Sequence, residues 1–399
     1  MLLMPNIDAV LSTAEIEKLR QLALRAISPI KPLAKSANLG GLLWNSKRTN
    51  AGRNLPHYYL VYFLLVDLLG FPDLGQEEKV AWSVPIEFEG KPFLIAHRKL
   101  GAGIFCIDSD KHETRAGQIV SLITKGVRTA DPFFRSLARQ AIRQSKINVR
   151  NNSAELFSRY EYLRDQFRKL LGEAQLRKNE VRTETRTDDS TTSTSYQFPA
   201  LRLSQEAQWL GIAAVDAFFA WTEHVFIHLA ILQQRVTTGD EVTQLAGAEW
   251  QEKFKRVLDL SDGNSKKFYD SLVLLRRQVR NYMAHGSFGK QGEAFDFHSS
   301  AGAVPVILDY RSGEARLSLI GETPFEEGDA ISTIEDFIAH LWSGQRHTAW
   351  LYIQDACLPV ILTFASDGTY EDAMQSEDDM EQFIYGLTRQ MDDAANMDW

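Results

Sequence analysis

The stretch SKKFYDSLVLLRRQVRNYMAHG, residues 265–286, decides how the second half of this chain folds. Apolar residues recur along it in alternating steps of four and three, which places them on one face of a helix. These residues are Phe268, Leu272, Leu275, Val279 and Tyr282. Gly286 follows the last turn and suits a helix terminator, because glycine adopts positive φ freely. We therefore predict an amphipathic helix over 265–285 whose apolar face packs into a core.

Three further helices are predicted around this one, over 205–232, 248–258 and 329–342, and together they would form a four-helix bundle. Alternating residues around 295–297 and 304–308 indicate a β-hairpin inserted in the bundle, with 317–319 as a possible third strand. The most hydrophobic helix contains Asp216, Glu223, His224 and His228. Because such residues are costly in lipid, we expect this helix in a protein core and predict no membrane contact.

The first half has a different pattern. Helices are predicted over 11–27 and 56–69, followed by strands over 80–88, 93–98 and 103–107, the first two joined through a turn at Glu89-Gly90. Helices are then predicted over 114–125, 132–144 and 154–176. The polar stretch 175–199, rich in Thr, Ser, Arg and Asp, is typical of a linker. The fold class is therefore α+β and mostly helical. We expect an N-terminal α+β module over 1–174, a linker over 175–199, a helical domain over 200–345 and an extension over 346–399.

Composition and charge narrow the class of protein. The net charge of the 399 residues is −8, but residues 366–399 hold ten acids and one base, so the rest of the chain carries about +1. We expect this acidic tail to be a disordered, solubilising end, or else a shield for a basic cleft. Cys106 and Cys357 do not suggest a disulfide framework, and residues 1–5 lack the features of a signal peptide. These features predict a cytoplasmic protein, and no cofactor or metal is predicted.

Arg280, Asn281 and His285 end the helix over 265–285, and these residue types suit phosphodiester chemistry. On an ideal helix, residues five apart lie about 140° apart around the axis. We therefore expect His285 to occupy a frayed last turn, where it can turn toward Arg280. Otherwise the same motif from a second subunit completes the pair.

This motif and its helical setting resemble the HEPN superfamily, in which an Arg is followed after about four to six residues by a His, often with Asn after the Arg. The resemblance runs from near Leu201 to near Ser343 and leaves the first half unrecognised. It implies a metal-independent endoribonuclease that acts on RNA as a homodimer through the HEPN-like domain. It also implies a toxin or antiviral defence effector, with the N-terminal module as the place for a protein or small-molecule regulator.

The resemblance gives each motif residue a role. His285 would move the proton of the ribose 2′-hydroxyl or protonate the leaving oxygen, while Arg280 would hold the phosphate. Asn281 would donate to a phosphate oxygen, although capping the local backbone is an alternative. Arg276 and Arg277 would extend the phosphate contacts or form ordinary solvated surface. A buried carboxylate needs a partner, so Glu223 is expected to orient Arg280 or to pair with another base.

Two other interpretations stay open. HEPN-like bundles also serve as non-catalytic nucleotide-binding or assembly modules, and a helix-terminal Arg and His can simply face solvent. Metal chemistry is the second: His224, His228 and Asp216 could hold an ion, and Glu87, Glu89, His97, Arg98 and Lys99 could form a metal-dependent nuclease site in the first half.

Overall fold

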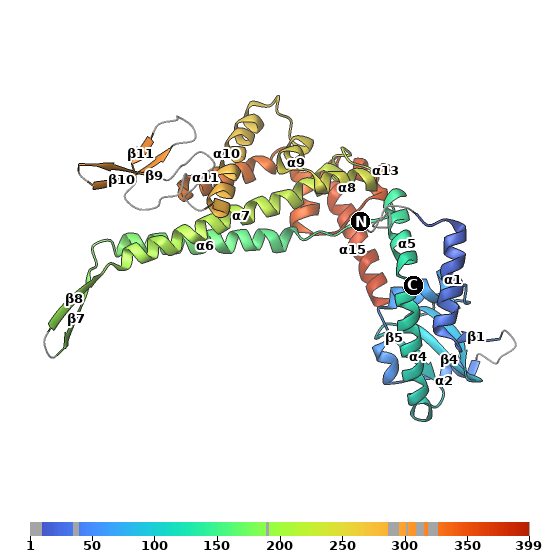
Figure 1. Cartoon of the computed structure of the whole chain (residues 1–399). Coiled ribbons are helices and arrows are strands. Elements are labelled where there is room, and N and C mark those ends of the chain that lie inside the picture. Colours follow the sequence, from blue (N-terminus) through green and yellow to red (C-terminus); the bar gives the residue numbers. More distant parts are fainter. Residues whose placement is uncertain are drawn as a thin grey trace. The chain divides into compact units, whose positions relative to one another are not determined.

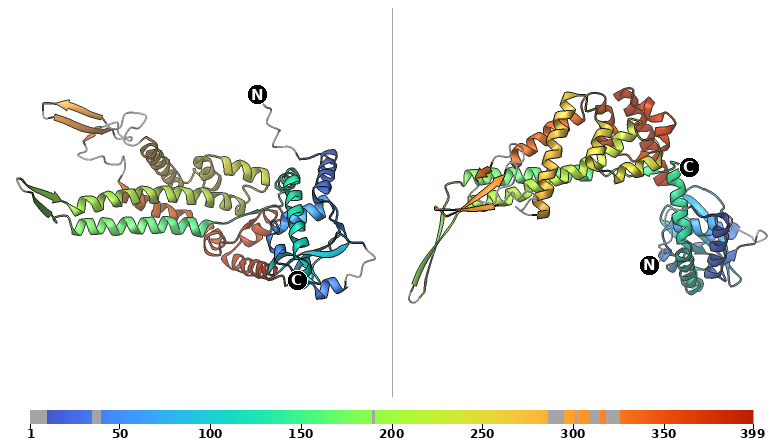
Figure 2. Two further views of the ribbon diagram at one scale, coloured as in Figure 1. Left: turned by 60° about the horizontal axis from the view of Figure 1, so that its bottom comes forward. Right: turned by 45° about the horizontal axis from the view of Figure 1, so that its top comes forward.

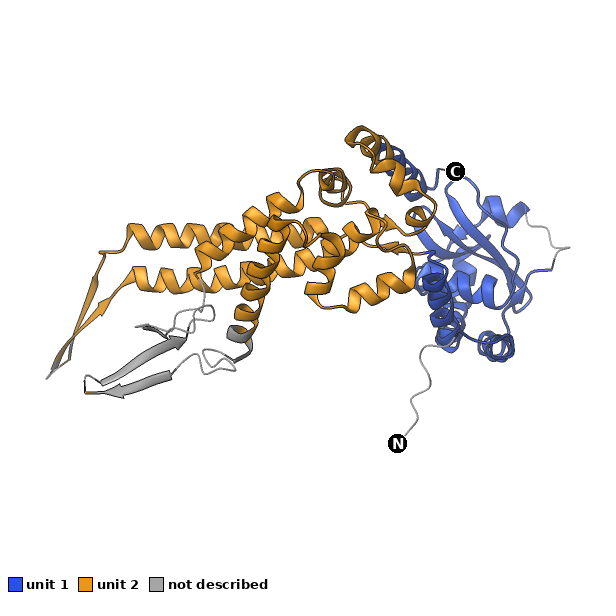
Figure 3. Cartoon of the chain, turned by 90° about the horizontal axis from the view of Figure 1, so that it is seen from above, with its two compact units in different colours: residues 1–146, 385–399 blue, residues 147–384 orange. Residues whose placement is uncertain are grey.

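The computed structural model describes residues 10–34, 40–188, 191–285, 295–300, 302–308, 315–317 and 326–398. The fold is α+β and mostly helical, as predicted. The chain forms two compact units (Figure 3). Unit 1 comprises residues 1–146 and 385–399, and unit 2 comprises residues 147–384.

Unit 1 is built on a five-stranded antiparallel sheet (Figure 1). The strand order is β1 (Lys31–Pro32), β3 (Val80–Phe88), β4 (Lys91–Arg98), β5 (Gly101–Cys106) and β2 (Lys47–Arg48). Glu89 and Gly90 have φ values of 50° and 72°, which is the backbone that a tight two-residue hairpin turn requires. The predicted three strands and their first turn are therefore confirmed.

Helices cover the sheet of unit 1. They are α1 (Thr13–Ile27), α2 (Gly40–Asn45), η1 (Ala51–Asn54), α3 (Tyr58–Tyr62) with the π-helical turn η2 (Phe63–Leu68), α4 (Ser109–Thr129) and α5 (Asp131–Arg143). Ser12 caps α1 in a capping box with Glu15. Residues of α1, η2 and α4 pack on one face of the sheet in a single apolar core, and Leu42 of α2 packs near Leu94 and Phe105 in a smaller cluster.

Unit 2 is mostly helical, and its elements follow in chain order. They are β6 (Asn148–Val149), α6 (Ser153–Leu176), β7 (Arg182–Asp188), β8 (Thr191–Gln197), α7 (Pro199–Leu232), α8 (Gly239–Gly247), α9 (Trp250–Val257), α10 (Gly263–His285), β9 (Phe295–Ser299), β10 (Gly302–Leu308), β11 (Ala315–Leu317), α11 (Glu327–Leu341), α12 (Arg346–Trp350), η3 (Leu351–Asp355), β12 (Val360–Ile361), α13 (Thr363–Ser366), α14 (Thr369–Ala373) and α15 (Glu377–Asn396), whose residues from 385 belong to unit 1. The four helices predicted for the bundle correspond to α7, α9, α10 and α11, and the predicted hairpin with its third strand corresponds to β9, β10 and β11.

Phe337 of α11 lies where the four helices of the predicted bundle meet. Its ring centroid is 6.0 Å from Phe218 of α7, 5.6 Å from Phe254 of α9 and 5.7 Å from Phe268 of α10. Phe337 itself is fully buried. Aromatic pairs at these separations contribute beyond their buried area, so this ring contacts all three other helices and helps to fix their packing.

Helix α7 is long and apolar enough to cross a membrane by length and composition. However, 61% of its most apolar window is buried within the protein. Trp221, Phe226 and Leu229 are among its fully buried residues. This is the environment of a core helix, as expected from its charged and histidine residues.

The boundary between the units differs from the prediction. The expected boundary was the polar stretch 175–199, but the units divide at 146/147, and β7 and β8 form an antiparallel hairpin within unit 2. Helix α6 lies along α7 in Figures 1 and 2, with ring centroids 4.8 Å apart between Phe157 and Trp221. Because α6 buries its apolar side on α7, the polar stretch connects two packed helices and does not link two domains.

The acidic tail is also different from the expectation of a disordered end. Residues 377–396 form α15, in which Met380 and Leu387 are buried. Phe383 stacks on Tyr352, with ring centroids 5.9 Å apart, and Asp398 forms an ion pair with Lys79. The acids lie on an amphipathic helix, so a strongly negative composition here coexists with a buried apolar side.

We expect Gly126→Ala in α4 to destabilise the protein by about 1–3 kcal/mol through overpacking. A Cβ atom at position 126 would lie 2.5 Å from Ile27 Cγ2 and 2.9 Å from Leu64 Cδ2. Gly117 of the same helix is the matched control, because its Cβ would meet only Ala51 Cβ, at 3.9 Å. Gly117→Ala should therefore raise stability by about 0.5–1 kcal/mol through helix propensity. Thermal unfolding measures both variants, and shifts of equal sign would contradict this packing.

Candidate functional site

A cleft of about 380 Å³ lies between α7 and α10 in unit 2. Each helix contributes four residues at positions i, i+3, i+4 and i+7, which is one continuous stripe on each helix. The lining residues are Asp216, Phe219, Ala220 and Glu223 from α7, and Arg276, Val279, Arg280 and Met283 from α10. The cleft therefore contains three of the predicted site residues: Glu223, Arg276 and Arg280.

Glu223 is the anion of an ionic network that joins three helices. Its Oε2 accepts a hydrogen bond from Lys253 Nζ of α9 at 3.0 Å, and its Oε1 accepts one from Arg276 Nη2 of α10 at 2.6 Å. Of the two expectations for Glu223, which were to orient Arg280 or to pair with another base, the structure shows the second, with Lys253 and Arg276 as the bases. Arg276 lies one turn before Arg280 on α10, and it is this arginine that contacts Glu223. Lys253 is a second partner because its buried ammonium needs a counter-ion.

Burial opposes ionisation of Glu223, but the hydrogen bonds from Lys253 and Arg276 outweigh it and hold the pKa of this carboxyl below its usual value. The Lys253 side chain is only 4% exposed, whereas those of Glu223 and Arg276 are about one-third exposed, at 34% and 32%. The network therefore has a buried end at α9 and an open end at the cleft.

Arg276 is held by aromatic rings as well as by Glu223. Its guanidinium carbon lies 5.6 Å from the ring centroid of Phe219 and 5.9 Å from that of Trp250, which are cation–π distances. Its Nη1 is buried and has no hydrogen-bond partner among the residues that the structure describes. One donor of this guanidinium is thus unsatisfied beside the cleft.

Arg280 lies one turn after Arg276, is exposed and lines the same cleft. Arg277 is also exposed but does not line it. Helix α10 ends at His285, as predicted for the helix over 265–285. The side chains of Asn281 and His285 lie outside the described residues. The structure therefore brings Arg280 together with Arg276 and Glu223.

Lys253 is the residue of this network that the sequence analysis missed. Its signal was a lysine on the apolar side of a short helix, because Trp250, Phe254 and Val257 of α9 are all buried. A lysine three residues after Trp250 must share that side and needs a carboxylate there.

His224 and His228 are structural in this fold. His224 Nε2 accepts a hydrogen bond from the Asn152 backbone N–H at 2.9 Å, and His228 Nδ1 lies 2.9 Å from the His224 carbonyl oxygen. Burial, together with the neighbouring His228, lowers the pKa of His224 to about 4. Across the described ranges, no three His, Cys, Asp or Glu residues form a group suited to a metal ion.

The carboxylates considered for a metal-dependent nuclease in unit 1 are engaged in surface ion pairs. Glu87 pairs with Lys31 at 2.9 Å, and Glu89 pairs with Arg115 at 3.2 Å. His97 stacks on Tyr58, with ring centroids 4.1 Å apart, and burial lowers the pKa of its imidazole. Arg98 lies over the ring of Phe105, 4.0 Å from its centroid, and Lys99 Nζ donates to Asn396 Oδ1 at 3.1 Å. These contacts account for the candidate residues of unit 1 as structural and surface groups.

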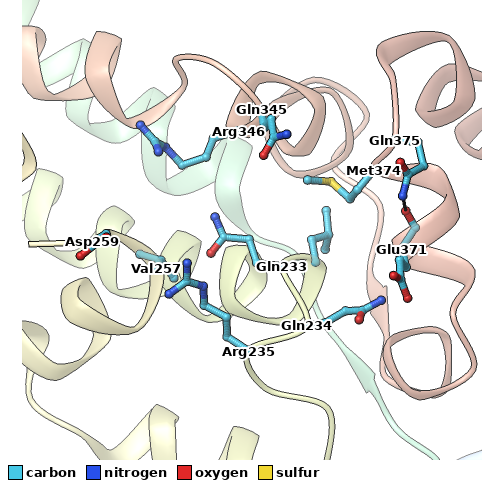
Figure 4. Close-up of a pocket in the computed structure, with 11 residues that line it drawn as sticks. Gln233, Gln234, Arg235, Val257, Asp259, Gln345, Arg346, Glu371, Met374 and Gln375 are labelled. Atoms are coloured by element: carbon cyan, nitrogen blue, oxygen red, sulfur yellow. Dashed lines mark hydrogen bonds between the residues drawn. The ribbon is translucent and has the colours of Figure 1, made fainter. Parts of the chain in front are cut away.

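A second cleft, of about 510 Å³, lies at the end of α7 (Figure 4). Gln233, Arg235, Asp259, Arg346 and Glu371 are among the residues around it. Arg346 Nε and Nη2 donate to the carbonyl oxygens of Leu341 and His340, so this guanidinium closes the end of α11. This cleft contains none of the predicted site residues, and we take the α7–α10 cleft as the candidate site.

Comparisons of the chain with protein families, with curated proteins and with solved structures found no match.

We expect Glu223→Gln to destabilise the protein by about 2 kcal/mol, because it leaves the buried ammonium of Lys253 without a counter-charge. Adding Lys253→Met should recover most of this loss. Glu252→Gln is the matched control, since Glu252 forms an exposed ion pair with Lys255 and should change stability by less than about 0.5 kcal/mol. Urea unfolding followed by circular dichroism measures the differences. Equal losses for the Gln variants at 223 and 252 would refute the buried network.

The depressed pKa of His224 predicts a pH dependence. Between pH 6.5 and about 4 the unfolded chain binds a proton at this residue that the folded chain excludes, so stability should fall as the pH falls through this window. His224→Gln keeps an acceptor for the Asn152 N–H but cannot titrate. Its stability should therefore fall less steeply than that of the wild type between pH 6.5 and 4. Thermal unfolding at pH 7, 6, 5 and 4 tests this, and identical slopes for both proteins would contradict it.

Proposed function

We propose that this chain is a metal-independent endoribonuclease of the HEPN-like type, cleaving RNA by attack of the ribose 2′-hydroxyl. The observation that carries the proposal is the α7–α10 cleft, in which Arg276 and Arg280 lie on one stripe of the helix that ends in Asn281 and His285. A phosphodiester is the substrate class that this cluster of cations suits best.

The charges at the cleft support a phosphate ligand. Among the described residues that line the cleft, Arg276 and Arg280 are basic and Asp216 and Glu223 are acidic. Lys253 adds a third cation, because it pairs with Glu223 from behind the cleft. Glu223 and the aromatic rings hold Arg276 in place, so its guanidinium is pre-organised before a ligand arrives. Arg280 is more exposed and would contact the phosphate that reacts, while Arg277 would extend the contact along the strand.

The chemistry needs a base, an acid and a group that stabilises charge. His285 would take the proton from the 2′-hydroxyl, and the 2′-oxygen would then form a bond to phosphorus as the bond to the 5′-oxygen breaks. The leaving 5′-oxygen would receive a proton from a protonated imidazole. Arg280, aided by Asn281, would stabilise the charge on the phosphate oxygens. The products are a 2′,3′-cyclic phosphate and a 5′-hydroxyl, and DNA lacks the hydroxyl that attacks.

The active unit that we propose is a homodimer through the HEPN-like helices. Helix α10 includes both position 280 and position 285, and residues five apart lie about 140° apart around a helix axis. Arg280 of one copy and His285 of the other would then act on one phosphate. The same imidazole, once it has taken the proton of the 2′-hydroxyl, would return a proton to the leaving oxygen, so that each site needs one Arg280 and one His285.

The resemblance further suggests a cytoplasmic toxin or antiviral defence effector that arrests growth by cutting RNA. In this proposal unit 1, with its separate sheet and core, is the module that receives a regulatory protein or small molecule. Its surface would set when the ribonuclease acts, and the chemistry would remain in unit 2.

The test is cleavage of single-stranded RNA by the purified full-length protein in excess EDTA. We expect fragments with cyclic phosphate ends, no cleavage of RNA carrying 2′-O-methyl groups, and losses of about 100-fold or more for His285→Ala and for Arg280→Ala. Lys267→Ala is the control, since Lys267 is an exposed base on the same helix and should retain activity.

Other outcomes would favour the other interpretations. RNA binding without cleavage, lost in Arg280→Ala, would indicate a non-catalytic binding module. Activity that EDTA abolishes and that Glu87→Ala reduces more than His285→Ala would indicate a metal nuclease centred on unit 1. Either result would overturn the proposed reaction.

A further inference from the structure

Strand β7 has an unusual alternation of residue types. Every second residue is charged, in the order base, acid, base, acid, and every residue between them is threonine. The charged residues are Arg182, Glu184, Arg186 and Asp188. Because successive side chains of a strand point to opposite faces, the charges share one face and the threonines share the other.

The hairpin of β7 and β8 leaves an edge of β7 open. The two strands pair antiparallel, with Arg182 opposite Gln197 and Thr185 opposite Thr194. Within the described part of the chain, β8 is the only strand that pairs with β7. Figures 1 and 2 show the hairpin projecting beyond the ends of α6 and α7. A two-stranded ribbon is marginally stable by itself, so an additional strand would stabilise it.

The order of charges on β7 is complementary to itself when the strand runs antiparallel. If Thr185 of one copy lies opposite Thr185 of another, Glu184 lies opposite Arg186, and Arg182 lies opposite Asp188. Each of these pairs occurs twice, once on each side of the two-fold axis. In this register odd-numbered residues lie opposite odd-numbered ones and even opposite even. The backbone N–H and C=O groups that point away from β8 in one copy therefore meet the equivalent groups of the other copy.

Other registers of the same strand do not pair all four charges with opposite charges. Moving the centre by one residue to position 184 places Arg182 opposite Arg186 and Glu184 opposite itself. Moving it to position 186 places Glu184 opposite Asp188 and Arg186 opposite itself. A parallel in-register pairing places every charge opposite an identical one. Like charges directly opposite each other are destabilising, so these registers are disfavoured. Centring on 183 or 187 keeps only one kind of opposite-charge pair, 182 with 184 or 186 with 188, so the register centred on Thr185 is the one that pairs all four charges.

We propose that two copies of this chain associate through antiparallel pairing of β7 with β7, centred on Thr185, to form a four-stranded sheet from two hairpins. The partner is a second copy because the charge order of β7 is complementary to that same strand. This surface is separate from the α7–α10 cleft, and the proposal does not rest on the proposed ribonuclease activity.

Contacts within one chain are compatible with this association. Arg186 pairs with Glu184 at 2.9 Å and Arg182 with Glu180 at 2.8 Å; the two arginine side chains are 79% and 62% exposed, and the two glutamates 48% and 35%. Exposed pairs of this kind are weak and are free to add a partner across a strand. Val181 and Tyr196 are 51% and 64% exposed on the same hairpin, so apolar area is also available for burial.

An alternation of charges on an edge strand has another known role, which is to prevent association. A charge-exchange experiment distinguishes the two. Glu184→Arg alone and Arg186→Glu alone each place like charges opposite each other twice. The double variant Glu184→Arg, Arg186→Glu restores opposite charges in the same register, with the same composition as the wild type.

Analytical ultracentrifugation of the full-length variants measures the association. We expect each single variant to raise the dissociation constant of the complex by about tenfold or more, and the double variant to restore the wild-type value. If the charges instead prevent association, the single variants should associate more tightly than the wild type, or all of the proteins should associate equally. The proposal would be overturned if both single variants kept the dissociation constant of the wild type, or if the double variant did not recover it.

Cross-linking tests the register itself. In a Cys357→Ser background, Thr185→Cys should form an intermolecular disulfide under mild oxidation, because directly opposite Cα atoms lie about 4.5–5.5 Å apart. Thr183→Cys is the matched control. In this register its two copies are offset by four residues, about 13 Å along the strands, which is too far for a disulfide. Equal cross-linking at 183 and 185 would contradict the register.

Discussion

One carboxylate, that of Glu223, compensates two cations from two other helices, and the arrangement of unit 2 around the cleft depends on it. Lys253 of α9 is buried and reaches its counter-ion only if α9 packs on α7, while Arg276 requires the same of α10. An unpaired ammonium at this depth would be costly, so the three helices are constrained together. Because α10 is fixed at Arg276, Arg280 one turn later lines the same cleft. The packing of the bundle and the position of the candidate site therefore have a common cause.

Much of the local structure follows from the sequence. The periodicity of 265–285 predicts α10, and the Glu89-Gly90 pair predicts the turn between β3 and β4, because each depends on near neighbours along the chain. The motif also led to the cleft, since Arg280 lies on its stripe. The identity of the Glu223 partners could not be predicted in this way. Two arginines one turn apart on α10 are equivalent in the sequence, and only packing distinguishes Arg276 from Arg280.

Errors arose where composition was used without tertiary contacts. The stretch 175–199 has the composition of a linker, yet it forms a hairpin because α6 and α7 pack along each other. The tail has the charge of a disordered end, but Met380 and Leu387 are spaced to share one side of α15 and are buried. In both cases a few apolar residues decide the structure, and a count of polar or charged residues does not reveal them.

The proposed reaction requires an arginine and a histidine that a continuous helix directs to different sides, which is why we propose a site that two subunits form together. The most direct measurement mixes two inactive proteins, Arg280→Ala and His285→Ala, after allowing their subunits to exchange. A site shared between copies predicts recovery of about a quarter of wild-type ribonuclease activity, since half of the dimers are hybrids with one intact site of two. If the mixture remains as inactive as its components while hybrid dimers are present, the pair does not act across subunits, and the central claim is contradicted.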